Sequence, residues 1–112
     1  MDDADAVTVT DDPDHHRYVL RVDDVTAGAI VYRPLPAAPT PTRVFLHTEV
    51  GAAFEGRGLG SRLIAAALAD SRERGIGVVP QCPFVRAYLG RHPGDLDVVP
   101  AADRAAYGLP SA

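Results

Sequence analysis

The residues best suited to chemistry surround a glycine-rich turn, E-G-R-G-L-G at 55–60, which separates an apolar run from an alanine- and leucine-rich segment. Glycine carries no β-carbon, so a ligand can approach the backbone closely at such a turn. The unpaired amides of a helix that starts there, together with its dipole, favour an anion. The turn therefore predicts a phosphate site, in which Arg57 meets the phosphate or points to solvent and Ser61 adds a hydroxyl or is an ordinary surface serine. Its candidate residues are Gly56, Arg57, Gly58, Leu59, Gly60 and Ser61.

Three further side chains are candidates for proton or acyl transfer. His47 and Glu49 stand two apart in a run of alternating residues, so they share one face of a predicted strand. Histidine accepts a proton near neutral pH, and we rank His47 slightly above Glu49 as the base that deprotonates an amine. Cys82 directly precedes Pro83 at a predicted helix start, where a thiol can act as a nucleophile or an acid. Two of the three have a structural alternative: His47 is then a satisfied structural histidine, and Cys82 a small buried hydrophobe.

Three predicted strands precede the turn and position these side chains. Alternating apolar residues indicate strands over 15–22 and 25–32, joined by a turn at Asp23 and Asp24. The prolines at 34, 36, 39 and 41 should stop the second strand and form a stiff loop. A third strand over 43–50 should alternate its side chains between two faces. We expect Val44, Leu46, Thr48 and Val50 on one face, and Phe45, His47 and Glu49 on the other.

A helix, a strand and a second helix follow the turn. Apolar residues at helical spacing predict a helix over 59–75, with Gly75 as its C-terminal cap. Residues 76–80 are wholly apolar, which is typical of a strand that lies parallel to the third strand after a crossover helix. Pro83 should begin the second helix, over 84–91. The sequence therefore predicts an α/β fold with a mixed sheet: antiparallel N-terminal strands, a central parallel pair that splays apart, and two main helices.

The length of 112 residues suits one domain with one modest core, and 46% hydrophobic residues are enough to build it. Residues 1–14 are acidic and show no sustained period, which favours a flexible leader with room for a short strand at 7–9. We expect residues 15–99 to form the domain and residues 100–112 a C-terminal tail.

The formal net charge of −4 argues against a non-specific nucleic-acid or membrane surface, which would need clustered basic residues, and suits an amine substrate. The single cysteine excludes an internal disulfide. No apolar segment is long enough for a signal core or a membrane span, so we expect a cytoplasmic protein. His15 and His16 have no metal-ligand spacing with any neighbour, so we expect no metal.

The spacing around the glycine turn excludes two kinds of nucleotide loop. Gly51 and Gly56 match the start of G-x-x-x-x-G-K-[ST], but Arg57 and Gly58 stand where the lysine and the hydroxyl are needed. The dinucleotide pattern G-x-G-x-x-G fails because Ser61 replaces its third glycine. No acidic residue stands about twenty positions further on to bind a ribose.

A third pattern fits the turn and both of its flanks. The stretch V-G-A-A-F-E-G-R-G-L-G at 50–60 resembles the acetyl-CoA signature of the GNAT superfamily of N-acetyltransferases, although Glu55 stands where that signature usually has Gln or Arg. The resemblance extends to a compact single-domain branch through H-T-E-V at 47–50, R-G-L-G at 57–60, P-Q-C-P-F-V at 80–85 and R-H-P at 91–93. The resemblance covers roughly residues 16–99, and four motifs in order are far more specific than a lone glycine loop.

The resemblance implies an acetyl-CoA-dependent N-acetyltransferase of GNAT-like fold, with the thioester between the splayed parallel strands. Backbone groups of Glu49 and Val50 would pair with the pantetheine arm of the CoA. Tyr88 stands one position short of the tyrosine that superfamily enzymes often use as the acid, so we expect it to pack and Cys82 to take that role. The amine acceptor would be a protein or peptide lysine, an amino terminus or a small amine. The alternative is a non-catalytic module that binds or senses CoA or acyl-CoA; the oligomeric state stays open.

Overall fold

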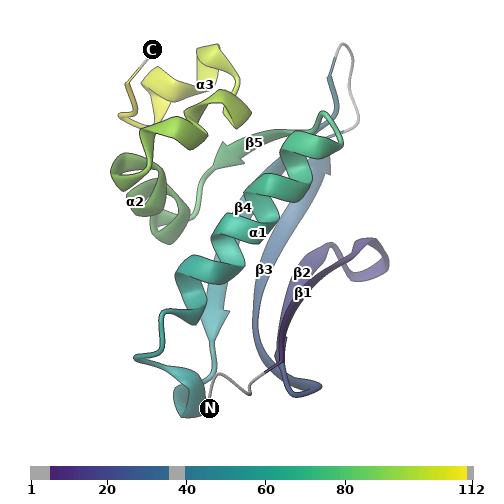
Figure 1. The fold of residues 1–112 in the computed structure, drawn as a ribbon. Helices are drawn as coiled ribbons and strands as arrows, with labels where there is room; N and C mark the ends of the chain where they lie inside the picture. Colours follow the sequence, from purple (N-terminus) through teal and green to yellow (C-terminus); the bar gives the residue numbers. More distant parts are fainter. Residues whose placement is uncertain (1–5, 36–39, 111–112) are drawn as a thin grey trace.

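The protein is built on one five-stranded mixed sheet, with a long helix lying across one face (Figure 1). The computed structural model describes residues 6–35 and 40–110. The strands stand side by side in chain order: β1 (Val7–Asp12), β2 (Arg17–Val22), β3 (Val25–Leu35), β4 (Thr42–Val50) and β5 (Gly77–Pro80). The helices are α1 (Leu59–Glu73), α2 (Pro83–Arg91) and α3 (Ala101–Ala106), with 3₁₀ turns η1 (Pro13–His15), η2 (Ala52–Phe54) and η3 (Pro93–Val98). The first four strands pair antiparallel and β5 pairs parallel to β4, so the predicted α/β class and its mixed sheet are confirmed.

The β2–β3 hairpin closes through the predicted two-residue turn. Val22 pairs with Val25, and both Asp23 and Asp24 have positive φ, 51° and 68°. Positive φ at both central positions defines the turn whose twist matches that of two antiparallel strands, and aspartate tolerates this conformation.

Strand β3 runs further than the proline pattern predicts. Pro34 pairs with Arg43 of β4, and β3 ends only at Leu35, so the expected stop after residue 32 is wrong. The amide of Tyr32 points towards β2 and donates to His16 O (2.9 Å), and by alternation the nitrogen of Pro34 lies on the same side. The β2 pairing ends at Val31, so the missing proline donor removes no ladder bond. The prolines at 36 and 39 lie outside the described residues.

Residues 7–12 form strand β1 of the sheet, so the short strand allowed at 7–9 is present and longer, and the expected flexible leader is wrong for these residues. Residues 1–5 lie outside the described residues. Val7–Asp12 pairs with β2 along its whole length, from Val7 opposite Val22 to Asp12 opposite Arg17. The sequence V-T-V-T-D-D gives a weak strand signal, because Asp11 and Asp12 occupy strand positions that are ordinarily apolar or neutral.

Asp11 explains why an acidic strand belongs there. Its side chain is 3% exposed and accepts hydrogen bonds from Tyr32 OH (2.6 Å), Arg43 Nη1 (3.0 Å) and Arg74 Nη1 (3.0 Å). Arg43 also donates to Tyr18 OH, whose own hydroxyl donates to Asp70 Oδ2 (2.8 Å). Burial, with the Asp70 hydrogen bond adding to it, raises the pKa of Tyr18 to about 12. This network ties β1 to β3, β4 and the end of α1.

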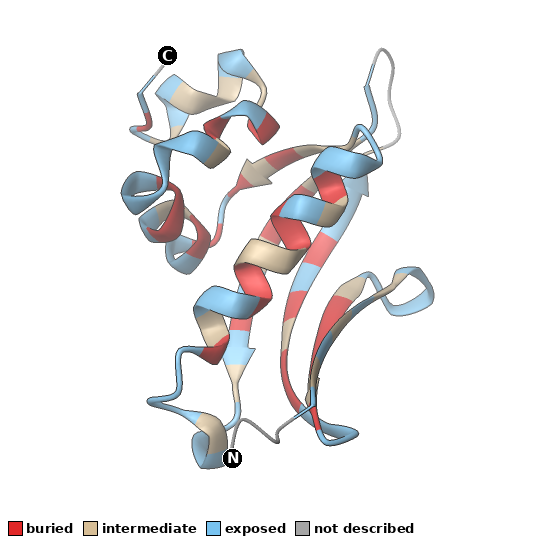
Figure 2. Ribbon diagram, in the orientation of Figure 1, coloured by how far each residue is buried: buried red, intermediate tan, exposed pale blue. Residues whose placement is uncertain are grey.

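Helix α1 covers the sheet with the expected apolar stripe, which Figure 2 shows as the buried side turned towards the strands. It begins after Gly58, whose φ is 70°, and ends at Gly75, whose φ is 68°. The amide of Ile76 donates to Ser71 O (2.8 Å) and that of Gly75 to Arg72 O (3.2 Å), which is the bond pair of a Schellman cap. The predicted helix and its glycine cap are confirmed.

A bulge in β4 changes the predicted assignment of its faces. Tyr32 pairs with Phe45 and Val31 with His47, so Leu46 has no partner on β3. Phe45 is consequently buried on the α1 side with Tyr18 and Tyr32, not on the side of His47 as the strict alternation predicted.

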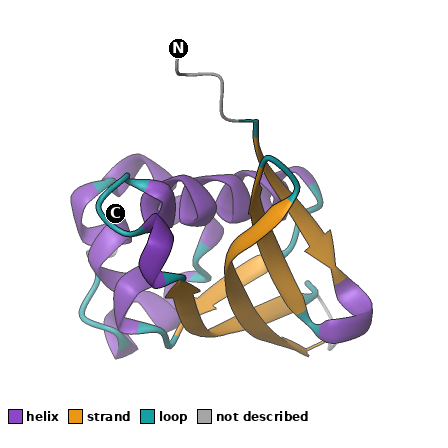
Figure 3. Cartoon of the chain, turned by 90° about the horizontal axis from the view of Figure 1, so that it is seen from below, coloured by secondary structure: helices purple, strands orange, loops and turns teal. Residues whose placement is uncertain are grey.

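The C-terminal segment is folded against the domain rather than forming a tail. Helices α2 and α3 and the turn η3 gather at the β5 end of the sheet, and Figure 3 shows them beside the curved strands. Leu96, Val99 and Leu109 are buried in the same core cluster as α1, so the expected boundary at residue 100 does not divide the core. Among the described residues, no helix has the length and apolar character needed to span a membrane.

Candidate functional site

Strands β4 and β5 diverge half-way along β4. Their parallel pairing runs from Thr42 opposite Gly77 to Phe45 opposite Pro80. Beyond Phe45, β4 continues to Val50 with β3 on one side and no β5 partner on the other. Along β4 the backbone N–H and C=O groups of successive residues point alternately towards β3 and away from it. Just after β4, Gly51 N donates to Ala27 O (2.7 Å), so the Gly51 amide faces β3. The backbone groups two and four residues earlier, at Glu49 and His47, therefore also face β3. The backbone groups of Thr48 and Val50 face the opposite edge of β4, which β5 leaves open. The open backbone groups are therefore those of Thr48 and Val50, and not those of Glu49 and Val50 as expected.

A cavity of about 330 Å³ lies where this open edge meets the glycine turn. It is bounded by the end of β4, the η2 turn, the first turn of α1 and the start of α2. Its volume is in the range of ordinary small-ligand sites. The lining residues are Thr48, Val50, Phe54, Glu55, Gly56, Gly58, Leu59, Gly60, Ser61 and Phe84.

The glycine turn has the backbone conformation that an anion cradle needs. Gly56 and Gly58 have φ values of 80° and 70°, and a β-carbon on either would project into open space. The first amide in the hydrogen-bond ladder of α1 is that of Arg62, which donates to Gly58 O (3.2 Å). The preceding amides, at Leu59, Gly60 and Ser61, are outside that ladder and beside the cavity, where they and the helix dipole favour a negative group. The residues present therefore fit a pyrophosphate.

The turn carries two charged residues, Glu55 and Arg57. Glu55 is exposed and is one of the residues that line the cavity, so this part of the lining carries a negative residue. The guanidinium of Arg57 lies 5.8 Å from the centre of the Phe54 ring, a cation–π distance. Arg57 is outside the cavity lining, and its role towards a phosphate stays a prediction.

Cys82 meets β4 through the hydroxyl of Thr48. It caps α2 and is 3% exposed, and its Sγ lies 3.3 Å from Thr48 Oγ1, which is also buried. The Cys82 amide donates to Phe45 O (2.8 Å), which holds the residue against the point where the strands diverge. Thr48 thus joins the cavity to the thiol.

His47 and Glu49 form the expected pair, on the other face of the sheet. His47 Nε2 lies 3.0 Å from Glu49 Oε2, and the two side chains are 60% and 69% exposed. Because side chains alternate along a strand, both project away from the face that carries Thr48. The structure therefore brings His47 and Glu49 together but places Cys82 on the opposite side of β4.

The other candidates of the second helix have structural contacts. Tyr88 is buried and stacks on His92, with ring centroids 3.9 Å apart and an interplanar angle of 15°. His92 Nδ1 lies 2.9 Å from Tyr88 O, and burial raises the pKa of the Tyr88 hydroxyl. This agrees with the expectation that Tyr88 packs.

Sequence patterns missed Thr48, Phe54 and Phe84 as residues of the cavity. The sequence places Phe84 after Cys82 and Pro83 at a helix start, but only the structure shows that its ring is 62% exposed and borders the cavity. Thr48 lies in the H-T-E-V motif, but only the fold shows that its hydroxyl reaches a thiol 34 positions away. Among the described residues no group of three or more His, Cys, Asp or Glu side chains is placed to hold a metal ion.

Comparison with known families decides the relationship of the chain. The model of the GCN5-related N-acetyl-transferase family matches residues 17–98, which is well over half of the sequence. The chain belongs to this family. The match includes the glycine turn, the splayed strands, Cys82 and the α2 helix, so the suspected superfamily membership is confirmed.

The chain is also similar to a solved structure. That structure is Arabidopsis thaliana Naa50 in complex with the bisubstrate analogue CoA-Ac-MVNAL, with a TM-score of 0.48 and 20% sequence identity. The alignment covers 57% of the present chain and 44% of the Naa50 chain. No curated protein sequence matches the chain.

Proposed function

We propose that the protein is an acetyl-CoA-dependent N-acetyltransferase that acts on an amine. The observation that carries this proposal is the cavity in which the glycine turn, the start of α1 and the open edge of β4 meet. Membership of the GCN5-related N-acetyltransferase family supports acetyl-CoA as the donor.

The cofactor side of the site is assigned to the backbone. The amides of Leu59, Gly60 and Ser61 hold the pyrophosphate, and Gly56 and Gly58 leave room for it. The outward backbone groups of Thr48 and Val50 pair with the pantetheine amides, since polar groups that a ligand covers need partners.

The acceptor side is assigned to the exposed His47–Glu49 pair. A carboxylate 3.0 Å from the imidazole orients it and stabilises its cation, so His47 can take the proton of an incoming ammonium group. Glu49 is the alternative base. Both side chains are more than half exposed, so an amine on the surface of another molecule could reach them. The acceptor that we propose is therefore a protein or peptide lysine, an amino terminus or a small amine.

Acetyl-CoA supplies a thioester carbonyl, which the neutral amine attacks to form the amide as the carbon–sulfur bond breaks. We assign Cys82 the proton that converts the departing thiolate to a thiol, because its Sγ lies beside the cavity residue Thr48. As the amide forms, its nitrogen loses one proton, which replaces the proton that Cys82 gives to the thiolate. An acyl-Cys82 intermediate would require exchange of the acetyl group from CoA to Cys82, followed by attack of the amine on the acyl carbon and release of the Cys82 thiol; the burial of Cys82 favours the direct route.

A non-catalytic module that binds CoA or acyl-CoA is the second candidate. Two observations favour it: the Glu55 carboxylate beside the anion site, and Tyr88, which is stacked on His92. Such a module would bind CoA, and a hundredfold excess over the dissociation constant would stabilise the fold by about 2.7 kcal/mol.

The test uses acetyl-CoA with panels of peptide and small amines, and it measures free thiol and the acetylated product. We expect turnover, reduced at least tenfold in His47→Gln. Asp14→Asn, at an exposed position in η1, is the control and should match the wild type. Mass spectrometry of the intact protein after exposure to acetyl-CoA, with and without Cys82→Ala, separates the routes, since only an acyl-enzyme adds one acetyl group to Cys82. Tight CoA binding with no thiol release from any acceptor would leave the binding module as the function.

A further inference from the structure

A second cavity lies at the other end of α1 from the glycine turn. It encloses about 640 Å³ and shares no lining residue with the glycine-turn cavity. The C-terminal residues of α1 border it, while the first residues of α1 border the other. The helix has 15 residues and rises about 1.5 Å per residue, so the two sites are about 20 Å apart. A molecule in this cavity would therefore lie about 20 Å from the phosphate site proposed at the glycine turn.

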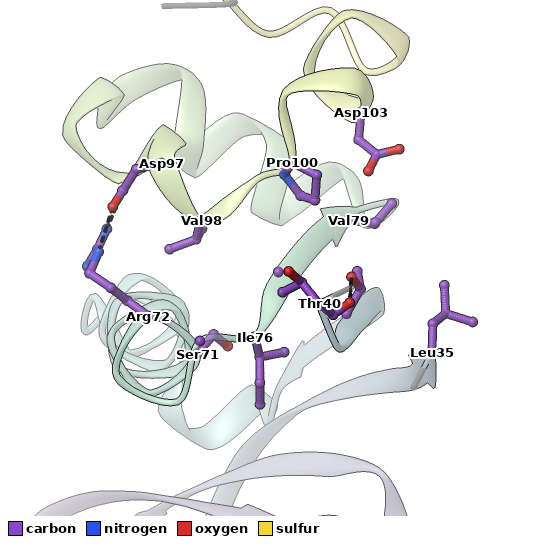
Figure 4. Close-up of a pocket in the computed structure, with 13 residues that line it drawn as sticks. Leu35, Thr40, Ser71, Arg72, Ile76, Val79, Asp97, Val98, Pro100 and Asp103 are labelled. Carbon is purple, nitrogen blue, oxygen red and sulfur yellow. Dashed lines mark hydrogen bonds and ion pairs between the residues drawn. The ribbon is translucent and has the colours of Figure 1, made fainter. Parts of the chain in front are cut away.

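The walls of this cavity are mainly apolar. Val79 of β5 and Ile76 just before it line one side, and Val98 at the end of η3 and Pro100 just before α3 line another (Figure 4). Its volume lies within the usual range for small-molecule sites, about 300–1,000 Å³. Burying an apolar body here would gain about 25 cal/mol per Å² of apolar surface removed from water.

The charges around the cavity are unevenly balanced. Arg72 donates to Asp97 (2.7 and 3.0 Å) and to Asp95 (3.1 Å), so two carboxylates compensate its single positive charge. In the view of Figure 4, Arg72 and Asp97 lie on one side of the cavity and Asp103 lies on the other. Within the described part of the chain, the carboxylate of Asp103 makes no ion pair or hydrogen bond. The neighbouring Arg104 donates to Val99 O (2.9 Å).

The helix end adds to the negative field. The cavity lies at the C-terminal pole of α1, where the aligned peptide dipoles leave partial negative charge. Two arginines, Arg72 and Arg104, thus stand against three carboxylates, those of Asp95, Asp97 and Asp103, and against a helix pole of negative sign. The field favours a cation and opposes an anion, while the walls favour a hydrocarbon body.

We propose that this cavity binds an amphiphilic ammonium compound, with its cationic group at Asp103 and its apolar body against Ile76, Val79 and Pro100. The cavity shares no lining residue with the glycine-turn cavity, and the proposal does not depend on the proposed function. Its occupant is a small molecule that carries one positive charge on an alkyl or aryl chain.

The test is a titration of isotope-labelled protein with hexylammonium chloride, followed by amide chemical shifts. We expect the largest shifts at Gly75, Gly77 and Val98, with hexanol binding more weakly and hexanoate not at all. Asp103→Asn should weaken hexylammonium binding about threefold to fivefold, the range expected for one partly screened ion pair. Asp24→Asn in the β2–β3 turn makes the same charge change away from the cavity and should leave the affinity unchanged.

A cavity-filling variant gives a second line of evidence. Val79→Phe should abolish hexylammonium binding, because the larger side chain would fill the apolar part of the cavity. If Val79→Phe folds poorly, Asp103→Asn still tests the proposal. Shifts that gather at Gly56, Gly58 and Gly60 would overturn the proposal, as would equal binding of hexanoate or an unchanged affinity in Asp103→Asn. Cavity shifts that depend on protein concentration instead of hexylammonium would mean that a second copy covers this surface, which also overturns it.

Discussion

The sharpest stability prediction concerns Asp11, the buried carboxylate of β1. Asp11→Ala removes the acceptor for three donors: the Tyr32 hydroxyl at 2.6 Å and one nitrogen each of Arg43 and Arg74 at 3.0 Å. Arg43 is left as a cation only 12% exposed, and removing one partner of a buried ion pair typically costs about 3–5 kcal/mol. Arg43 keeps its hydrogen bond to Tyr18 and lies 4.2 Å over the Tyr32 ring, so we expect the lower end, about 3 kcal/mol.

The assay is urea denaturation with a thermal melt on the same samples. A loss of about 3 kcal/mol is a large part of the roughly 5–15 kcal/mol that stabilises a domain, and it should lower Tm by about 12 °C at this chain length. The control is Asp14→Ala, which makes the same charge change at an exposed residue of η1 and should stay within about 0.5 kcal/mol of the wild type. If Asp11→Ala matched Asp14→Ala, the ion network would contribute nothing, and the N-terminal strand would behave as the flexible leader that the sequence predicts.

Three further predictions address other parts of the molecule. Because the pKa of Tyr18 is raised to about 12, its stabilising contribution is complete below pH 10 and is lost as pH rises towards 12; the urea midpoint should fall over this range, and more gently in Tyr18→Phe. Thr48→Val should slow the alkylation of Cys82 by iodoacetamide about fivefold, because the thiolate loses a hydroxyl donor at 3.3 Å, whereas Thr48→Ser should retain the wild-type rate; equal rates in all three proteins would contradict this. Glu55→Gln should tighten CoA binding about twofold to fivefold by calorimetry at low salt, since it removes a carboxylate beside the anion site, and the gain should shrink at high salt; no change at low salt would place Glu55 too far from the phosphates to act.

Local sequence signals predicted the elements around the site because each depends on residues close together in the chain. Gly58 and Gly75 bound α1 through their positive φ values, Asp23 and Asp24 form the hairpin turn, and Pro83 starts α2. The apolar residues after Gly75 likewise predicted a strand parallel to β4. These signals therefore determined the mixed sheet and the position of the glycine turn.

Signals that depend on pairing between strands were misjudged. The bulge at Leu46 turns Phe45 to the α1 side, and no alternation pattern contains that extra residue. The acidity of β1 suggested a leader, because only the fold supplies the arginines that neutralise Asp11. Pro34 looked like a strand end, yet β3 has no β2 partner there and loses no bond.

The sequence by itself determined the family, the glycine cradle and the pairing of His47 with Glu49, since motif order, backbone freedom and strand alternation are local properties. The tertiary structure decided what these residues face. It placed Thr48 against Cys82, directed His47 and Glu49 to the opposite side of β4, and opened a second cavity at the far end of α1. The physical reason is that these contacts join segments distant in the chain, and their geometry is fixed by strand register, by the bulge in β4 and by buried ion pairs.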